Sequence, residues 1–300
     1  MTPRILDAAP RKLLAMNGAA LRASIAAAEG RTIAAEVIAP YQSPVDGVSH
    51  GELAAAMGAD LVILDQYDTL RPQISGVPAD LLSQQSPLSA YAELIGRPVG
   101  LNLIVADAQQ GAFLGGRLVN PENVERAVTQ GSRIINLYTR PKIGGTHEGM
   151  LAAASMIHEV AGDDALLIGV PSFSRPAPRS TEAIRAYCED ALALVEAGCA
   201  AIALPMPGSK QGWTIDAAVA IVDAVREAGA LAWLFLTGSI EGAPESLITQ
   251  MALQAKQIGA DAYRIDEAGL SGMPVPENIL AFSLAIRGRQ HTFRRMASAR

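Results

Sequence analysis

The chain has 300 residues, of which 50% are hydrophobic and 18% charged, and its formal net charge is −6 at pH 7. This length suits one barrel-sized domain with a terminal extension, and the composition allows a large buried core. The negative charge argues against a nucleic-acid partner, which usually requires a basic surface. We find neither a signal-peptide pattern nor an apolar stretch of about 18 residues, so we expect a cytoplasmic protein without a membrane partner.

Residues 1–30 are expected to form a helical extension that covers one end of the fold or packs on a second subunit, which makes a homo-oligomer one possible state. Apolar runs then recur at a nearly regular interval, each after a helix-like stretch that ends in glycine. Glycine is favoured there because the residue after a helix often takes a left-handed conformation. The runs begin at Thr32, Leu61, Val99, Arg133, Ala165, Ala200, Leu231 and Ala262.

These runs are apolar throughout rather than alternating, which is typical of parallel strands covered on both faces. Eight strand–helix units predict an α/β protein with a (β/α)8 barrel over residues 31–300 and a C-terminal helix, all in one domain. In such barrels the loops that follow the strands build the functional site. Polar residues at predicted strand ends are therefore the candidates.

The first four strands carry several such residues. Glu36 lies inside the first strand, and its burial requires a partner; Arg264 in the neighbouring eighth strand would supply an ion pair in the barrel floor. Asp65 and Asp68 follow the second strand and are the best candidates for holding Mg²⁺, should a divalent ion bind. The third and fourth strands contain the lone amides Asn102 and Asn136, which a substrate or water could pair.

The densest polar segment follows the fourth strand. Arg140 and Lys142 would hold an anionic substrate, and His147 would act as an acid or base. The alternative is a solvated loop in which Thr146 caps the next helix and Glu148 stabilises its first turn.

The loops after the seventh and eighth strands are rich in glycine and serine, a composition that suits phosphate binding by backbone N–H groups. Tight strand–helix turns also use glycine without any ligand, so that alternative stays open. The phosphate candidates are Thr237, Gly238, Ser239, Gly269, Ser271 and Gly272. The arginine-rich C-terminus, from Arg287 onward, indicates either a patch for an acidic partner or a solvated helix end.

Two resemblances to known families accompany these patterns. The segment LDQYDTL, with Asp65, Tyr67 and Thr69, resembles the first motif of haloacid dehalogenase-type hydrolases, which would make Asp65 a nucleophile. That match spans only seven residues, and the acidic pair that the family carries later in its sequence has no counterpart in the expected order here. We therefore interpret the match as accidental. The segments VDGVSHGELAAAMGADLVILDQYD, PVGLNLI and GSRIINL resemble barrels of the BtpA type and of the phosphoenolpyruvate mutase/isocitrate lyase group. The mutase group's acidic Mg²⁺-binding stretch is reduced here to Asp107.

The second resemblance implies an enzyme that acts on a small anionic metabolite, phosphorylated or an oxo-acid, by lyase, isomerase or phosphonomutase-like chemistry. Arg140 and Lys142 would neutralise the anion, Asn102 and Asn136 would orient it, and Asp65 or His147 would move a proton. The alternatives are a non-catalytic barrel that binds a partner through its termini, or a haloacid dehalogenase-like hydrolase.

Overall fold

The computed structural model describes residues 3–171, 177–267, 269 and 271–298. Its centre is a closed barrel of parallel strands that follow one another in chain order. The predicted (β/α)8 architecture is confirmed, and each strand begins within one residue of its expected start. The strands are β1 (Thr32–Ile38), β2 (Leu61–Asp65), β3 (Val99–Val105), β4 (Ile134–Thr139), β5 (Leu166–Gly169), β6 (Ala201–Pro205), β7 (Leu231–Leu236) and β8 (Ala262–Ile265).

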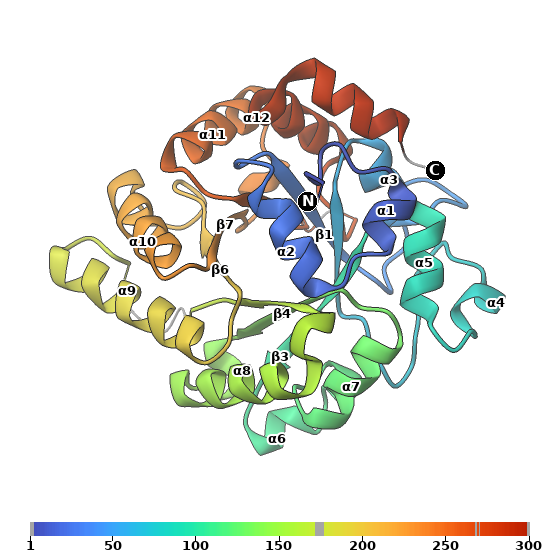
Figure 1. Ribbon diagram of the computed structural model, residues 1–300, viewed down its shortest axis with the longest axis horizontal. Helices are drawn as coiled ribbons and strands as arrows, with labels where there is room; N and C mark the ends of the chain where they lie inside the picture. The colour runs from blue at the N-terminus through green and yellow to red at the C-terminus, as the bar shows by residue number, and fades with distance from the viewer. Residues whose placement is uncertain (1–2, 172–176, 268, 270, 299–300) are drawn as a thin grey trace.

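Helices surround the barrel, with one main helix after every strand (Figure 1). These are α3 (His50–Ala56), α5 (Pro87–Ile95), α7 (Pro121–Thr129), α8 (His147–Ala161), α9 (Thr181–Glu196), α10 (Ile215–Glu227), α11 (Glu245–Ile258) and α12 (Pro276–Ala297). Before the barrel stand α1 (Pro10–Leu14) and α2 (Gly18–Ala26), and the loops contain α4 (Ala79–Leu82), α6 (Ala108–Gly111) and the 3₁₀ turns η1 (Gly115–Arg117), η2 (Pro141–Ile143), η3 (Gly162–Asp164) and η4 (Ile240–Gly242). Within the described residues, no helix is both long and apolar enough to cross a bilayer.

The glycine rule that located the strands has a structural basis. Gly96 and Gly259 end α5 and α11 in the left-handed conformation, with φ of 65° and 87°. A side chain at such a φ would be strained, so glycine lets the chain leave the helix and enter the next strand. The other helix-ending glycines of the series also have positive φ.

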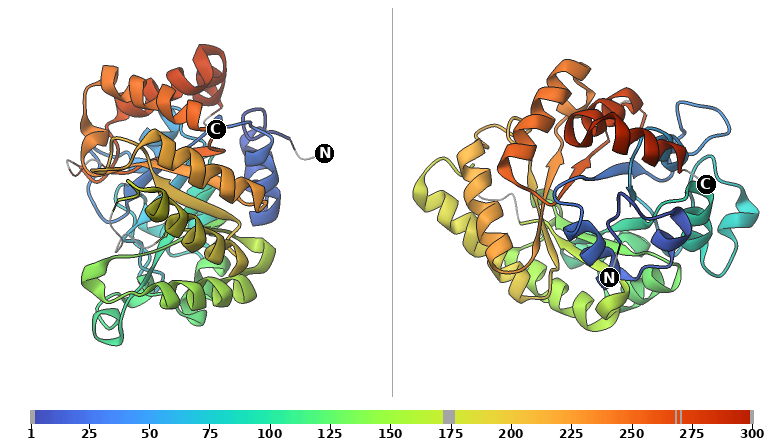
Figure 2. Two further views of the ribbon diagram at one scale, coloured as in Figure 1. Left: turned by 90° about the vertical axis from the view of Figure 1, so that its left-hand side faces the viewer. Right: turned by 45° about the horizontal axis from the view of Figure 1, so that its top comes forward.

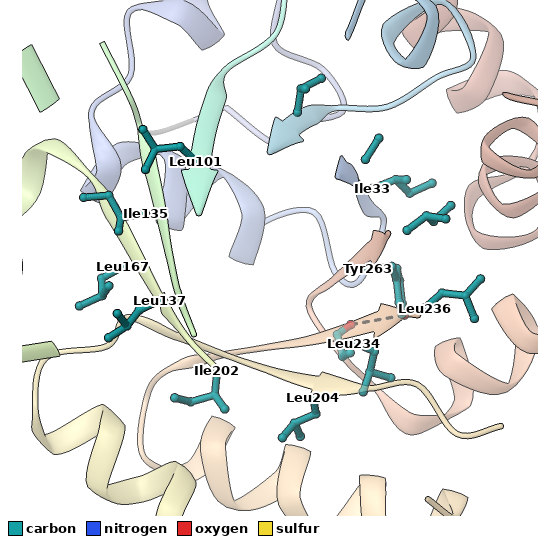
Figure 3. Packing of buried hydrophobic residues seen from close by; sticks show 14 of the residues in the cluster. Ile33, Leu101, Ile135, Leu137, Leu167, Ile202, Leu204, Leu234, Leu236 and Tyr263 are labelled. Atoms are coloured by element: carbon teal, nitrogen blue, oxygen red, sulfur yellow. Dashed lines mark hydrogen bonds between the residues drawn. The ribbon is translucent and has the colours of Figure 1, made fainter. Parts of the chain in front are cut away.

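Strand residues divide between two apolar clusters. One face of each strand packs outward against the helices, as Leu101, Ile135, Leu204 and Leu234 do in Figure 3. The opposite face points into the barrel, where Leu61, Ile134, Leu231 and other apolar side chains meet the N-terminal helices. Burial on both faces explains why the strands are apolar throughout.

The strand register arranges the inward-facing residues in layers, with alternate strands contributing to each, as in other barrels of this class. Above inward-facing residues at the strand starts such as Leu61, Ile134 and Ala262, four successive layers lead to the mouth. They hold Ala34, Gly100, Ile168 and Trp233; then Ile63, Asn136, Ala203 and Arg264; then Glu36, Asn102, Val170 and Phe235; and finally Asp65, Tyr138, Pro205 and Asp266. The first layer is apolar apart from the indole N–H, and polar residues accumulate toward the carboxyl ends of the strands. The barrel therefore has a dry base and a polar mouth.

The N-terminal extension covers the base. Ile5, Leu13, Leu21 and Ile25 are fully buried in the same cluster as the lowest barrel residues. Gly18 of α2 lies against the start of β5, so close that a Cβ atom would stand 2.2 Å from the carbonyl carbon of Ala165. In Figure 2 (left) the two blue helices lie on one side of the ring, across one end of the barrel. The expected capping role is confirmed.

The arginines of the C-terminal helix require a correction. Arg287 and Arg295 are buried, and both form ion pairs with the buried Asp60, at 2.6 Å and 2.7 Å. They hold α12 to the segment before β2, so neither is available for an acidic partner or for solvent. Arg289 and Arg294 remain exposed, whereas Arg300 lies outside the described residues.

Candidate functional site

Asn102 is the centre of a buried hydrogen-bond network in the barrel mouth. Its Nδ2 donates to Asp65 Oδ1 at 2.9 Å and to Glu36 Oε2 at 3.2 Å, so one amide group joins two carboxylates. Its Oδ1 accepts a hydrogen bond of 2.9 Å from Asn136 Nδ2. The residues come from β1, β2, β3 and β4, and all four are at least nine-tenths buried. The structure thus joins Asp65, Asn102 and Asn136, three of the predicted site residues.

Arg264 closes the network on the side of β8. Its Nη1 lies 3.2 Å from Glu36 Oε2, so the two predicted partners meet, and its Nε donates to Asp266 at 2.7 Å. The guanidinium also lies over the ring of Phe235, 4.9 Å from the centroid. The predicted position in the barrel floor is wrong. The Glu36 side chain lies in the layer next to that of Asp65, near the mouth.

Burial dominates the protonation of Glu36. It raises the pKa of this carboxyl group to about 8, against the opposing effect of Arg264, and the nearby charges of Asp266 and Asp65 raise it further. Glu36 is therefore mostly protonated at neutral pH. An acid beside a carboxylate, both held by the same amide, is an arrangement that can donate and accept a proton.

Basic residues stand above this network at the rim. The guanidinium of Arg140 lies 5.5 Å from the ring centroid of Tyr138, whose hydroxyl donates to Asp65 Oδ1 at 3.3 Å. Lys210, in the loop after β6, interacts electrostatically with both Asp266 and Arg140, and burial lowers the pKa of its amino group. The rim therefore offers two cations near the carboxylates.

Two other predicted residues do not join this group. Lys142 is exposed on η2, outside the hydrogen-bond network. His147 is the first residue of α8, and its Nε2 lies 3.7 Å from Asp190 Oδ1 of α9, so its ring faces the helix layer. Thr146 caps α8 by accepting from the Gly149 N–H, as the alternative interpretation of this loop predicted.

The predicted phosphate loops hold carboxylates at their N–H groups. The backbone N–H of Ser239 donates to Glu241 Oε1 at 3.1 Å, and that of Gly269 donates to the Glu267 carboxylate. Gly272 accepts a hydrogen bond from the Ile38 N–H and joins the loops after β8 and β1. A phosphate bound at these N–H groups would have to displace two acidic side chains. Thr237, Gly238 and Ser271 lie in the same loops, and the phosphate assignment stays a prediction.

The candidate Mg²⁺ ligands have different surroundings. Asp68 accepts hydrogen bonds from the Leu70 and Gly116 N–H groups, both at 2.9 Å, and is thereby committed to its loop. Asp65 faces an amide N–H and a hydroxyl, both of which are donors. Among the described residues no group of three or more His, Cys, Asp or Glu side chains is arranged to hold a metal ion. Because Mg²⁺ is often held by only one or two carboxylates together with water and substrate oxygens, its binding here stays a prediction.

The resemblance to haloacid dehalogenases is wrong as a statement of fold. Asp65 ends a strand of a closed barrel rather than of an open doubly wound sheet. Tyr67 donates to Gln130 and Thr69 to the Gly116 carbonyl, so the other two motif residues are buried structural side chains. The hydrolase alternative is therefore set aside.

Glu241 follows the seventh strand among the polar residues expected at the mouth, but it was not one of the phosphate candidates. It is buried in η4, burial raises the pKa of its carboxyl group to about 7, and its Oε2 has no hydrogen-bond partner among the described residues. The burial that raises its pKa exists only in the fold and could not be predicted from the loop sequence.

A hollow of about 920 Å³ lies at the other end of the barrel. It is lined by α2, the starts of β5 to β7 and the last turns of α8 and α9, including Gly18, Arg22 and His158. Active sites of this fold lie at the carboxyl ends of the strands. We therefore place the candidate site at the mouth and not in this hollow.

The model of the family described as Domain of unknown function (DUF7916) matches residues 6–300, and the chain belongs to this family. No curated protein matches the sequence significantly. Among solved structures, the carboxyl transferase domain of Rhizobium etli pyruvate carboxylase with pyruvate aligns at a TM-score of 0.55, with 14% identity over 99% of this chain and 52% of the other. The same domain with pyruvate and biocytin gives 0.55, with 15% identity over 98% and 52%.

A putative fructose-1,6-bisphosphate aldolase from Coccidioides immitis aligns at a TM-score of 0.49, with 15% identity over 95% of this chain and 93% of the other, a likeness that carries no argument. The chain spans about half the length of the pyruvate carboxylase chains that it matches. At these identities the likeness shows the barrel fold alone. The BtpA and mutase resemblances stay expectations.

Proposed function

We propose that this member of the DUF7916 family is an enzyme that acts on a small anionic metabolite, an oxo-acid or a phosphorylated compound, by lyase, isomerase or phosphonomutase-like chemistry at a carbonyl or enolate carbon. The observation that carries the proposal is the amide shared by two carboxylates, Asn102 Nδ2 with Asp65 and Glu36. Two acidic groups side by side in a barrel interior are unfavourable for stability, and such arrangements cluster at functional sites.

In the proposed mechanism Asp65 removes a proton from the substrate. It lies in the uppermost layer of the barrel, where Asn102 and Tyr138 orient its carboxylate through Oδ1. Glu36, protonated at neutral pH because burial raises its pKa, is the neighbouring proton donor. A base and an acid held one amide apart can move a proton on and off a carbon next to a carbonyl group.

Arg140 and Lys210 are proposed to bind the anionic group of the substrate. Both lie at the rim, where Lys210 interacts electrostatically with Asp266 and with Arg140. A planar guanidinium binds carboxylate or phosphate oxygens in a fork, and an ammonium group adds a second charge. This replaces the pair Arg140 and Lys142, and it does not require the N–H groups that Glu241 and Glu267 occupy.

A ligand panel tests this proposal. We expect at least one short oxo-acid, hydroxy acid or organic phosphate to raise the melting temperature, because a ligand that binds the folded state stabilises it by mass action. The Arg140→Ala variant should lose the shift, whereas Lys142→Ala, exposed nearby, should keep it. If every anion left the melting temperature unchanged, or if both variants responded like the wild type, the proposed site would be wrong.

A further inference from the structure

The hollow of about 920 Å³ at the base of the barrel lies between α2 and the ends of α8, α9 and α10. A Cβ atom added at Gly162 or Gly229, which come after α8 and α10, would meet no atom within 4 Å, so both helix ends border open space. The wall that α2 contributes is apolar and exposed, and its alanines are Ala19, Ala23 and Ala26. An exposed apolar hollow of this size indicates an interaction site.

The rim of this hollow is negative. Three exposed carboxylates line it, those of Glu159, Asp163 and Glu196. The guanidinium of Arg22, which also lines it, donates to the backbone carbonyl group of Gly229. The carboxyl ends of α8, α9 and α10 lie there as well, and such helix ends carry partial negative charge. An apolar group flanked by cations would therefore fit the hollow.

The last part of α12, residues 289–297, has such a surface, and we call it the tail. The chain leaves the helical conformation at Gly288 (φ 73°, ψ 172°), which separates the tail from the rest of α12. One face of the tail is buried against the fold through Thr292 and Arg295. The other face is exposed and carries an aromatic ring, that of Phe293, which is 52% exposed. The residues of this face are Arg289, Gln290, Phe293, Arg294 and Ala297.

The tail and the hollow belong to the same end of the barrel. Arg294 lies 3.0 Å from Asp7, and Arg295 donates to the Ile5 carbonyl group, so the tail packs against the N-terminal extension that covers the base. The hollow borders α2 of the same extension, and in Figure 1 the tail and the ends of α8 and α9 lie on opposite sides of α2. No residue of the tail lines the hollow of its own chain.

We propose that the protein forms a two-fold symmetric dimer in which the tail of each copy docks into the base hollow of the other. The Phe293 ring would pack on the exposed alanines of α2, and Arg289 and Arg294 would lie next to the carboxylates of the rim. The hollow supplies apolar surface and negative charge, whereas the tail supplies an aromatic ring and positive charge. Because the two surfaces are complementary, a second copy of this chain is the partner that fits.

A two-fold axis allows both contacts to form at once. When the tail of one copy meets the hollow of its partner, symmetry brings the partner's tail to the first hollow. The bases of the two barrels would then face each other, and both mouths would point away from the interface, so the candidate site would stay uncovered. Such an isologous contact closes at two copies and does not grow into a filament. The proposal does not depend on the proposed function.

Sedimentation velocity of the full chain over a micromolar concentration series tests the proposal. We expect the wild type to dimerise. Phe293→Asp places a charge where the ring would be buried, and Ala23→Trp fills the hollow. Each substitution should raise the dissociation constant by at least about 30-fold, as for a residue that dominates an interface. Both positions are exposed, and melting curves show whether the variants fold. Should Ala23→Trp fail to fold, Ala26→Trp fills the hollow from the same helix.

Phe113→Asp is the matched control, because Phe113 is 77% exposed in the loop after β3, at the mouth end of the barrel. It should leave the dissociation constant unchanged. Mixing two variants tests the contact itself. Phe293→Asp keeps its hollow and Ala23→Trp keeps its tail, so an equimolar mixture should contain more dimer than either variant alone, through one intact contact.

Three results would overturn the proposal. The first is a wild type that stays monomeric at every concentration. The second is a dimer that neither substitution weakens, because it would form through another surface. The third is a pair of monomeric variants that gain no dimer on mixing, because the tail and the hollow would then not contact each other.

Discussion

The barrel contains two buried charged clusters, one at each end, and they are built on different principles. At the base, Asp60 pairs with Arg287 and Arg295, and Arg97 donates to the carbonyls of Ala55, Gly96 and Arg295. Those carbonyls lie at the carboxyl ends of α3, α5 and α12, where the helix dipole is negative. The carbonyl groups at these helix ends therefore offset the surplus positive charge of the three arginines.

At the mouth three acidic side chains, Glu36, Asp65 and Asp266, lie around one buried arginine, Arg264, with Arg140 and Lys210 at the rim. Two of the three acidic groups share a single amide donor, that of Asn102. Buried groups that face an opposite charge or a helix-end carbonyl hold elements together, whereas buried acidic groups placed side by side indicate chemistry. The contrast predicts that substitutions at the base mainly lower stability, whereas substitutions at the mouth mainly lower activity.

The largest expected effect is at the base. Asp60→Ala removes the carboxylate that Arg287 and Arg295 share and leaves two guanidinium groups without it in a dry interior. We expect the free energy of unfolding to fall by about 3–5 kcal/mol, as when one partner of a buried ion pair is deleted. Urea denaturation measures it. The control is Asp7→Ala, whose partially exposed pairs with Arg4 and Arg294 should contribute about 1 kcal/mol or less.

Asp65→Asn should show the opposite pattern. It removes a negative charge from beside Glu36, so we expect the stability to change by less than about 1 kcal/mol or to increase, because mouth residues are not optimised for stability. Turnover of any substrate found by the ligand panel should fall by about 10²- to 10⁴-fold, the usual contribution of a general base. A variant as active as the wild type would remove Asp65 from the mechanism.

The contrast also explains how far the sequence could predict the molecule. Strand positions followed from Gly30, Gly96 and the apolar runs, because helix ends and double burial leave local patterns. The pairing of Glu36 with Arg264 followed from the closure of the barrel, which makes the first and last strands neighbours. Fold-level reasoning was therefore sufficient wherever topology alone decides which residues meet.

Side-chain direction could not be predicted in the same way. The arginines of α12 seemed to form a solvated helix end, yet Arg287 and Arg295 turn inward to Asp60, a partner more than 200 positions away in the sequence. His147 stands in the densest polar loop but faces α9, since its position on the first turn of α8 fixes its direction. Such outcomes depend on packing between helices, which spacing along the chain does not encode.

A pH titration sharpens the comparison further. Because the pKa of Glu36 is raised in the folded state to about 8, that state holds the proton more tightly than the unfolded chain between about pH 4.5 and pH 8. Wild-type stability should therefore decline as pH rises through this window, by at most about 1.4 kcal/mol per pH unit. Glu36→Gln should lack this decline. Glu241→Gln should remove a similar slope that ends near pH 7. Identical slopes in the wild type and both variants would show that neither carboxyl group is protonated in the fold.

The smallest effect is expected between the two clusters, in the helix layer. His147→Gln removes the contact of 3.7 Å with Asp190, which is ionic only when the imidazole is protonated. We expect the free energy of unfolding to fall by about 1 kcal/mol or less, because a partly exposed pair contributes little. Ligand affinity at the mouth should be unchanged, since the ring faces α9 and not the barrel. A fall in affinity on this substitution would show that the ligand site includes His147 at the start of α8. The acid–base pair would then be expected near α8 rather than around Asn102.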